Sequence, residues 1–353
     1  MIINQLLPSI SPGDAVSNSV LNIMNLLNEM GFDSKIYAES IHPAMQEVAL
    51  PISSCPKDCS LIYHMAIGYP FAYKLPNFKG KKILIYHNIT PDVFFRDYKE
   101  IQELCIEGRR QLKFLVPYID YAWADSEYNR LELEELGYKN THVTPIIINF
   151  EDYKRNPSQK LMEKFKAEKH ITNILFVGRI APNKKQEDII KVFYYYKKYI
   201  NEDSRLFLVG SYSGMERYYN ELMELVKELQ LEDVYITGHI SFEEILAYYT
   251  NADLFLCMSE HEGFCVPLVE AMHFEIPIIA YKSSAIGETL GNGGILVLEK
   301  QYKEIAELMH IVLSTPKIKE RMIINQKKRL EFFSKKNTEN IFRERIQEVL
   351  LGS

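Results

Sequence analysis

Residues 173–185 read Asn-Ile-Leu-Phe-Val-Gly-Arg-Ile-Ala-Pro-Asn-Lys-Lys, a short apolar run followed by a glycine and three basic residues. The apolar run predicts a buried strand, Gly178 permits a turn, and a helical pattern follows over residues 187–196. Arg179 and Lys184 then stand beside a helix N-terminus, which is the arrangement that an anionic phosphate group favours. A solvated turn with surface cations would use the same residues, so this stretch alone leaves both interpretations open.

The same order of strand, turn and helix recurs along most of the chain. Such alternation predicts an α/β fold with two Rossmann-like, doubly wound halves, each around a largely parallel sheet. The predicted strands are residues 1–7, 35–38, 61–65, 82–87, 121–125 and 142–148 in the first half, and residues 173–177, 205–209, 233–237, 254–258, 277–281 and 294–298 in the second. Ligands of such sheets bind outside the carboxyl ends of the strands, so we expect the site in a cleft between the two sheets.

A polar segment separates the two halves. Residues 149–160 contain a proline and lack an apolar period, which is typical of a linker. We therefore predict an N-terminal domain over residues 1–155, a second domain over residues 156–335, and a final helix, 336–353, that packs back toward the first domain.

Composition narrows the class of protein. A chain of 353 residues suits two domains, and 47% hydrophobic with 25% charged residues excludes collagen-like, coiled-coil and disordered chains. The net charge of −6 argues against nucleic acid as the main partner. No run approaches the roughly 18–20 apolar residues of a membrane-spanning helix, and the first residues lack a signal-peptide pattern, so we expect a cytoplasmic protein. The five cysteines are expected to be reduced, and Cys55 and Cys59 lack the further ligands of a zinc site.

A second motif follows the predicted strand 254–258. Residues 259–272 read Ser-Glu-His-Glu-Gly-Phe-Cys-Val-Pro-Leu-Val-Glu-Ala-Met, a glycine-containing loop that leads into a helix. Backbone N–H groups near Gly263 would form another anion cradle. Glu262 and Glu270 suit sugar hydroxyls, because a carboxylate accepts the hydrogen bonds that hydroxyls donate. Exposed acids without a ligand are the alternative interpretation.

The two motifs together resemble those of a known family. Gly178-Arg179-x4-Lys184 and Glu262-Gly263-Phe264-x5-Glu270 resemble the donor-site signature of the retaining glycosyltransferases of family 4, which have the GT-B fold. The resemblance covers nearly the whole chain. Further similar segments are Gly13-Asp14-Ala15 and residues 124–127 and 144–150, while residues 63–68 and 86–91 resemble a subgroup that builds bacterial surface polysaccharides and related glycoconjugates.

The resemblance implies a role for each matching residue. Arg179 and Lys184 would hold the donor diphosphate and stabilise it as it leaves. Glu262 would contact hydroxyls of the transferred sugar, and Glu270 would accept the ribose hydroxyls of the nucleotide. The ring of His87 would meet the donor sugar near the reacting carbon. The remaining implied donor contacts are Gly13, Asp14, Gly178, Gly210, His239, Gly263, Phe264 and Cys265.

Two residues depart from the family pattern. Cys265 stands where the family usually has glycine, and we expect it to follow the same path only with a negative φ. Lys185 stands where the family often has glycine, and it could add a third cation or point to solvent. The glycines at Gly210 and before His239 are explained equally well by turn formation.

The implied reaction transfers a hexose-type sugar with retention at the anomeric carbon. The chain contains no Asp-x-Asp motif, so we predict no metal and no cofactor, with the leaving diphosphate stabilised by Arg179, Lys184 and helix N-termini. No general base is assigned, and Glu262 is not assigned as a nucleophile. UDP is preferred over GDP because it is the commoner donor nucleotide in the resembling family.

The acceptor side is less defined. We expect a saccharide, lipid-linked or protein-linked acceptor, with His64 either lining its site or serving a structural role, and His261 either near the donor or facing solvent. Basic clusters in the first half could rest on the inner face of a membrane, or could be a solvated surface. These clusters are Lys79, Lys81 and Lys82, and Arg109, Arg110 and Lys113.

The sequence is also compatible with two other functions. A nucleotide-sugar epimerase of GT-B fold would convert the donor without an acceptor. A non-catalytic partner subunit would be expected to have lost some of the four residues Arg179, Lys184, Glu262 and Glu270, and all of them are present.

Overall fold

The computed structural model describes residues 2–351 and divides into two compact units. Unit 1 is Met1–Asn149 with Phe332–Ser353, and unit 2 is Phe150–Glu331. These divisions fall a few residues before the domain boundaries expected from the sequence. The binding roles expected for the two domains stay predictions.

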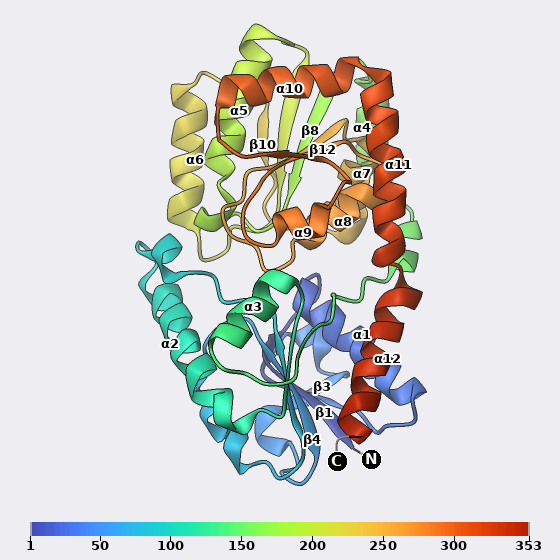
Figure 1. The fold of residues 1–353 in the computed structure, drawn as a ribbon. Helices are drawn as coiled ribbons and strands as arrows, with labels where there is room; N and C mark the ends of the chain where they lie inside the picture. The colour runs from blue at the N-terminus through green and yellow to red at the C-terminus, as the bar shows by residue number, and fades with distance from the viewer. Residues whose placement is uncertain (1, 352–353) are drawn as a thin grey trace. The chain divides into compact units, whose positions relative to one another are not determined.

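Unit 1 is built around a sheet of seven parallel strands in the order β3-β2-β1-β4-β5-β6-β7 (Figure 1). The strands are β1 Ile3–Ile10, β2 Ile36–Ile41, β3 Ala49–Pro51, β4 Ser60–Met65, β5 Lys82–Tyr86, β6 Tyr121–Ala124 and β7 Thr141–Val143. The register pairs Leu6 of β1 with Tyr37 of β2 and with Tyr63 of β4. The switch in strand order beside β1 and β4 is where doubly wound sheets bind ligands.

The helices of unit 1 come from both ends of the chain. They are α1 Ala15–Glu29, α2 Lys99–Leu115, α3 Glu127–Glu135 and α12 Lys335–Leu351. Short 3-10 turns connect them at Pro43–Met45, Ile52–Ser54, Pro70–Asn77, Asp92–Phe95 and Val116–Tyr118. The C-terminal helix α12 places Phe342, Ile346 and Val349 in one core cluster with Ile3 and Trp123. The ring of Phe342 meets the Trp123 ring edge-on at 5.6 Å between centroids, so α12 is part of this hydrophobic core.

Unit 2 is built around a sheet of six parallel strands in the order β10-β9-β8-β11-β12-β13. The strands are β8 Thr172–Val177, β9 Ser204–Val209, β10 Val234–Ile236, β11 Leu254–Cys257, β12 Ile278–Tyr281 and β13 Ile295–Val297. Its helices are α4 Gln159–Ala167, α5 Gln186–Tyr199, α6 Glu216–Glu228, α7 Phe242–Asn251, α8 Val266–His273, α9 Ile286–Leu290, α10 Tyr302–Ser314 and α11 Pro316–Phe332, with 3-10 turns at Phe150–Lys154 and Pro182–Lys184. The α/β fold with two Rossmann-like halves is therefore confirmed.

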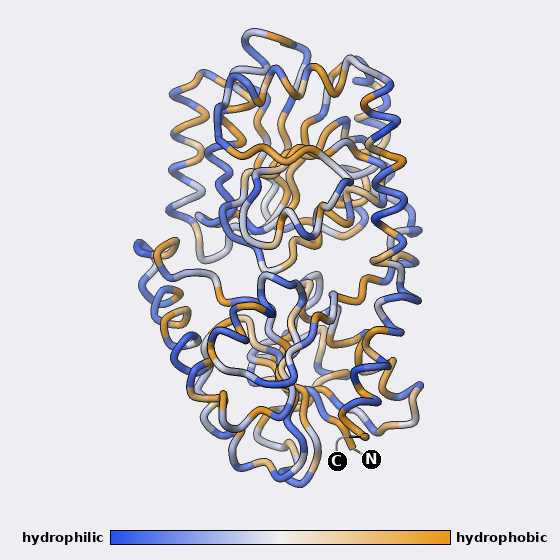
Figure 2. Tube along the Cα trace, in the orientation of Figure 1, coloured by the Kyte–Doolittle hydropathy of each residue, from blue (hydrophilic) through white to orange (hydrophobic). Residues whose placement is uncertain are grey.

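Hydrophobic residues concentrate in the strands of each unit, as Figure 2 shows. The sequence pattern missed β3, a three-residue strand at the sheet edge that ends in a proline. It also extended the last strand of unit 1 to residue 148, whereas β7 ends at Val143. Residues 146–148 are apolar and buried without belonging to a strand, so their apolar run reflects burial rather than sheet pairing.

Candidate active site

The loop after β8 lies against the loop after β9. The N–H of Gly178 donates to Val209 O at 2.9 Å, and the N–H of Ile180 donates to Ser211 O at 2.9 Å. The two backbones approach so closely that a Cβ on Gly210 would lie 2.0 Å from the carbonyl oxygen of Gly178. Gly210 also has a φ of +152°, which L side chains rarely adopt. The close approach and this backbone conformation together explain why a glycine stands here.

Arg179 follows this turn and is exposed. Its guanidinium donates to the carbonyl oxygen of Ser213 at 3.2 Å. The carboxylate of Glu216 is the charged group that interacts with it from the start of α6. Arg179 therefore stands at the carboxyl end of β8 as a cation held from the loop after β9.

Lys184 lies in the same loop and forms an ion pair with Glu262. The Lys184 Nζ is 2.6 Å from a Glu262 carboxylate oxygen, and these side chains are 20% and 9% exposed. Burial acts to lower the pKa of Lys184, but the Glu262 carboxylate, together with the thiols of Cys265 and Cys257, outweighs it and the pKa is raised. The two motifs found in the sequence are thus joined by their most buried charges.

Asn183 fixes the two loops to each other. Its side-chain amide donates to His261 O at 3.1 Å, and its carbonyl oxygen accepts from the N–H of Glu260 at 2.9 Å. Asn183 is buried, as is His261. No sequence pattern singled out Asn183, whereas the structure shows that it connects the cationic loop to the acidic loop.

Cys265 does not keep the negative φ that we expected. Its φ is +75°, and it caps the N-terminus of α8 in the left-handed region. Its thiol is buried and forms a hydrogen bond with the Cys257 thiol, which, together with burial, raises the pKa of Cys265. A non-glycine residue held there signals strain at a candidate site. The loop therefore follows a glycine-like path in spite of the side chain.

Lys185 also lies in the left-handed region, with a φ of +55°. Its Nζ is 3.3 Å from Glu187 and 3.6 Å from Glu260. Lys185 is thus held between two carboxylates, and its role as a third cation toward a donor stays a prediction.

The strain at Lys185 leads to a stability prediction. We expect Lys185→Gly to be more stable than Lys185→Ala by about 1 kcal/mol, because both remove the amine and only alanine retains a Cβ at positive φ. Urea denaturation of the two variants measures the difference. Lys191 in the interior of α5 is the matched control, where alanine should be more stable than glycine by about 1 kcal/mol. An equal or reversed order at Lys185 would contradict the strain.

Glu270 lies on α8 between two tyrosines. One carboxylate oxygen accepts from the Tyr153 hydroxyl and the other from the Tyr249 hydroxyl, each at 2.5 Å. Burial raises the pKa of Glu270, and the two tyrosine hydrogen bonds offset part of that effect. Neither tyrosine was singled out from the sequence, because nothing in the spacing relates Tyr153 and Tyr249 to Glu270.

The other predicted donor contacts of unit 2 lie at the carboxyl ends of its strands. Phe264 is buried and its carbonyl oxygen accepts from the Thr289 hydroxyl, while Gly263 is half-buried. The N–H of Glu262 donates to the Ser284 hydroxyl at 2.8 Å. His239 follows β10 and is exposed.

In unit 1, the predicted residues Gly13 and Asp14 begin α1. Asp14 is the N-cap, and its carboxylate accepts from the N–H of Ser17 at 2.9 Å and from the Ser17 hydroxyl at 2.8 Å. Gly13 has a φ of +77° and open space where a Cβ would be. Both lie at the carboxyl end of β1. Helix capping accounts for Asp14 in the absence of a ligand.

His87 follows β5 and is buried, with both ring nitrogens occupied. Nδ1 is 2.8 Å from an Asp125 carboxylate oxygen, and Nε2 is 3.0 Å from Nδ1 of His64. Nε2 of His64 is 2.9 Å from the side-chain oxygen of Gln5. His64 is thus buried in a polar chain, and the structure leaves the contact of the His87 ring with a sugar as a prediction.

The basic clusters of unit 1 are partly engaged within the unit. Arg109 forms hydrogen bonds with Glu132 and with the carbonyl oxygen of Ile89. Arg110 is 3.6 Å from Glu107, and Lys82 donates to Gly80 O at 3.3 Å. Among residues 2–351, no helix is long and apolar enough to cross a membrane.

The thiols of Cys55 and Cys59 interact with each other and with Asn4. The Asn4 amide lies 3.3 Å from the Cys59 sulfur, and the hydrogen bond with Cys55 lowers the pKa of Cys59 to about 7. Within the described part of the chain, no group of three or more histidine, cysteine or acidic side chains could hold a metal ion.

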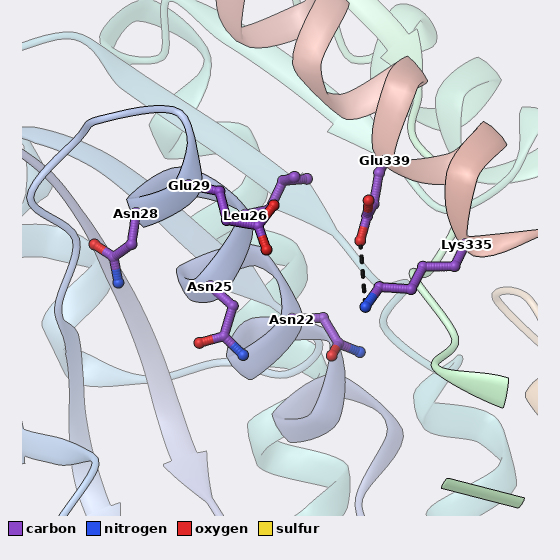
Figure 3. Close-up of a pocket in the computed structure, with 7 residues that line it drawn as sticks. All are labelled: Asn22, Asn25, Leu26, Asn28, Glu29, Lys335 and Glu339. Carbon is purple, nitrogen blue, oxygen red and sulfur yellow. Dashed lines mark ion pairs between the residues drawn. The ribbon is translucent and has the colours of Figure 1, made fainter. Parts of the chain in front are cut away.

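A hollow of about 490 Å³ lies within unit 1, between α1 and the start of α12 (Figure 3). Asn22, Asn25 and Asn28 line it from α1, and Lys335 and Glu339, 3.7 Å apart, line it from α12. None of the predicted site residues lines this hollow, so the chemistry predicted from the motifs lies elsewhere in the two units.

Comparison with known proteins agrees with the two motifs. Residues 158–329 match the family model of the glycosyl transferases group 1, and both motifs fall within that range. Similar curated proteins are a lipopolysaccharide 1,2-N-acetylglucosaminetransferase of Salmonella typhimurium, 27% identical over 216 residues, and the capsular polysaccharide biosynthesis glycosyltransferase CapM of Staphylococcus aureus, 26% identical over 189 residues. The alignments cover 59% and 52% of this chain and 56% and 48% of those proteins, so this chain spans about half their length.

Solved structures extend the similarity to the whole fold. HepE of Anabaena in complex with UDP-glucose has a TM-score of 0.76 and 16% identity, and the alignment covers 99% of this chain and 100% of that one. Sucrose-phosphate synthase from Thermosynechococcus elongatus has a TM-score of 0.75 and 16% identity, with full coverage of both chains. At such identities the likeness shows the fold alone. That fold is GT-B, as predicted, and the match of residues 158–329 to the group 1 model agrees with the expected family resemblance.

Proposed function

We propose that this chain, whose residues 158–329 match the model of the glycosyl transferases group 1 family, is a retaining glycosyltransferase. It moves a hexose-type sugar from a nucleotide diphosphate sugar, with UDP preferred over GDP, to an acceptor in glycan assembly. The acceptor is a saccharide, free or carried by a lipid or a protein. The capsular and lipopolysaccharide transferases among its relatives support the assembly of a surface polysaccharide.

The observation that carries the proposal is the ion pair between Lys184 and Glu262. The half-buried Lys184 and the exposed Arg179 offer two positive charges at the carboxyl end of β8. Such cations stabilise the charge that develops on a departing diphosphate. The carboxylate of Glu262, held at the same place, accepts hydrogen bonds from sugar hydroxyls. One loop pair thus offers groups for both halves of a nucleotide sugar.

Glu270 supports the nucleotide part of the proposal. Tyr153 and Tyr249 fix its carboxylate from both sides. Each carboxylate oxygen can accept more than one hydrogen bond, so Glu270 retains capacity for the two ribose hydroxyls of a donor. A carboxylate locked by its neighbours binds with less loss of side-chain entropy.

We further propose that transfer needs no metal ion, since Arg179 and Lys184 supply the positive charge. Acceptor binding is assigned to unit 1, where the basic residues of the first half could attract an anionic lipid carrier at the inner face of the membrane. Donor and acceptor are the partners of this function, and nucleic acid is not among them.

The test is calorimetric titration of the purified protein with UDP, GDP and their common sugar conjugates, with and without magnesium. We expect one nucleotide to bind equally well in both conditions and to bind more weakly to Glu270→Gln. Glu275→Gln, which removes an exposed ion pair with Lys327 in the same unit, is the matched control. Failure of every nucleotide to bind would refute the assignment and favour a non-catalytic subunit.

Incubation with the bound donor separates the remaining alternatives. Conversion of the donor without an acceptor would identify an epimerase. Transfer to a saccharide acceptor would support the proposal, and NMR of the product's anomeric proton would then test retention. Inversion at that carbon would overturn the retaining mechanism while leaving the transferase in place.

A further inference from the structure

A chain of four side chains runs through the interior of unit 1. Asp125 is bonded to His87, His87 to His64, and His64 to Gln5, at 2.8, 3.0 and 2.9 Å. All four residues are 9% exposed or less. The rings of the two histidines are nearly parallel, with an interplanar angle of 7°. In a buried chain of this kind, each contact needs one donor and one acceptor.

Gln5 sets the direction in which the hydrogen bonds of this series are donated. Its amide nitrogen donates to the carbonyl oxygen of Val20 at 3.0 Å, so its side-chain oxygen faces His64. The opposite amide orientation would place two oxygen acceptors against each other at Val20. The side-chain oxygen of Gln5 is only an acceptor, and Nε2 of His64 must therefore carry a hydrogen.

The protonation of His64 decides that of His87. Burial and the neighbouring His87 hold the pKa of His64 well below its usual value, so His64 is neutral and carries a single hydrogen. With that hydrogen on Nε2, Nδ1 of His64 is an acceptor. Nε2 of His87 must then donate to it.

Asp125 lies at the other end of this hydrogen-bonded series and contacts His87. With Nε2 of His87 protonated, a second hydrogen on Nδ1 lets the ring donate to the Asp125 carboxylate as well. The ionisable side chains that hydrogen-bond along this chain, among residues 2–351, are the two histidines and Asp125. In hydrolase triads the histidine keeps one nitrogen as an acceptor for a substrate proton, but here both nitrogens donate to the protein.

We propose that Gln5 and His64 are positioning residues that hold His87 as an imidazolium paired with Asp125, so that His87 is not the base in the transfer. His87 offers a fixed positive charge instead. This inference rests on the proposed function for its meaning in catalysis. It leaves the acceptor's proton to another group, such as the departing phosphate oxygen of the donor.

The protonation state can be measured without any activity. In protein labelled with ¹⁵N-histidine at neutral pH, NMR should show two N–H groups on His87 and one, at Nε2, on His64. Gln5→Met removes the acceptor while keeping a side chain of similar length. His64 can then donate from Nδ1, and we expect His87 to lose one hydrogen.

Gln5→Glu is the matched rescue, because its carboxylate accepts from His64 as the amide oxygen does. This variant should retain both N–H groups on His87. Circular dichroism and thermal unfolding check that each variant is folded. A single N–H on His87 in the unmodified protein, or an unchanged His87 in folded Gln5→Met, would overturn the proposal.

The pH dependence of kcat for sugar transfer tests the charge of His87 independently of NMR. If His87 acts as a cation, kcat of Gln5→Met should fall roughly tenfold at pH 8 and recover toward pH 6, with the donor KM unchanged. If His87 were instead the base, the loss of a hydrogen would raise kcat of Gln5→Met at pH 8 relative to that of the unmodified protein. Absence of nucleotide binding would refute the transferase assignment but would leave the NMR result intact.

Discussion

Lys184→Met should lower kcat/KM for sugar transfer by about 10²–10³-fold. Methionine keeps the apolar stem of the lysine but removes the charge that we assign to the leaving diphosphate. It also leaves the Glu262 carboxylate, which is 9% exposed, without its cation. Removing one partner of a buried ion pair costs about 3–5 kcal/mol, so unfolding should be measured beside the kinetics.

Lys185→Met is the matched control, because it removes the neighbouring lysine of the same loop. Lys185 pairs with Glu187 and Glu260 at longer distances and is more exposed. We expect its kcat/KM to change less than threefold, in keeping with the small contribution of such pairs. Equal losses in the two folded variants would show that the positive charge of the loop as a whole matters, and would refute a specific role for Lys184.

The fold and the main charges of unit 2 could be predicted from the sequence, because they depend on local pattern. Strand β8, its turn at Gly178 and the two cations occupy one short stretch, so their spacing in sequence is close to their spacing in space. The pairing of Lys184 with Glu262 was not predicted, because it depends on the order of the parallel strands, in which β8 and β11 are neighbours and end at the same edge.

Contacts between distant segments could not be predicted in the same way. Gln5 lies in an apolar strand, and its partner His64 is far along the chain. A polar residue inside a buried strand was the available signal, because buried polar groups need partners. Tyr153 and Tyr249 had no such signal, since tyrosine is common in a chain with 23 of them. The positive φ of Cys265 was missed because cysteine rarely adopts the left-handed region.

Gly210→Ala should destabilise the protein by about 3–4 kcal/mol. The new Cβ would lie 2.0 Å from the carbonyl oxygen of Gly178 and 2.7 Å from its carbonyl carbon. Both atoms are backbone, so no side-chain rotation can relieve the overlap, and the loops after β8 and β9 would have to separate. That movement would also displace Arg179, whose guanidinium is held by Ser213 of the loop after β9.

Gly287→Ala in α9 is the control for the substitution itself. A Cβ there would have its nearest neighbour at 3.7 Å, which is ordinary contact, and alanine is the better helix former. We expect this variant to be as stable as the unmodified protein or up to about 1 kcal/mol more stable in thermal and urea unfolding. A Gly210→Ala protein that unfolds like the unmodified one would contradict the close approach of the two loops. Such a result would remove the physical reason for a glycine at this strand end, and turn formation alone would then have to explain it.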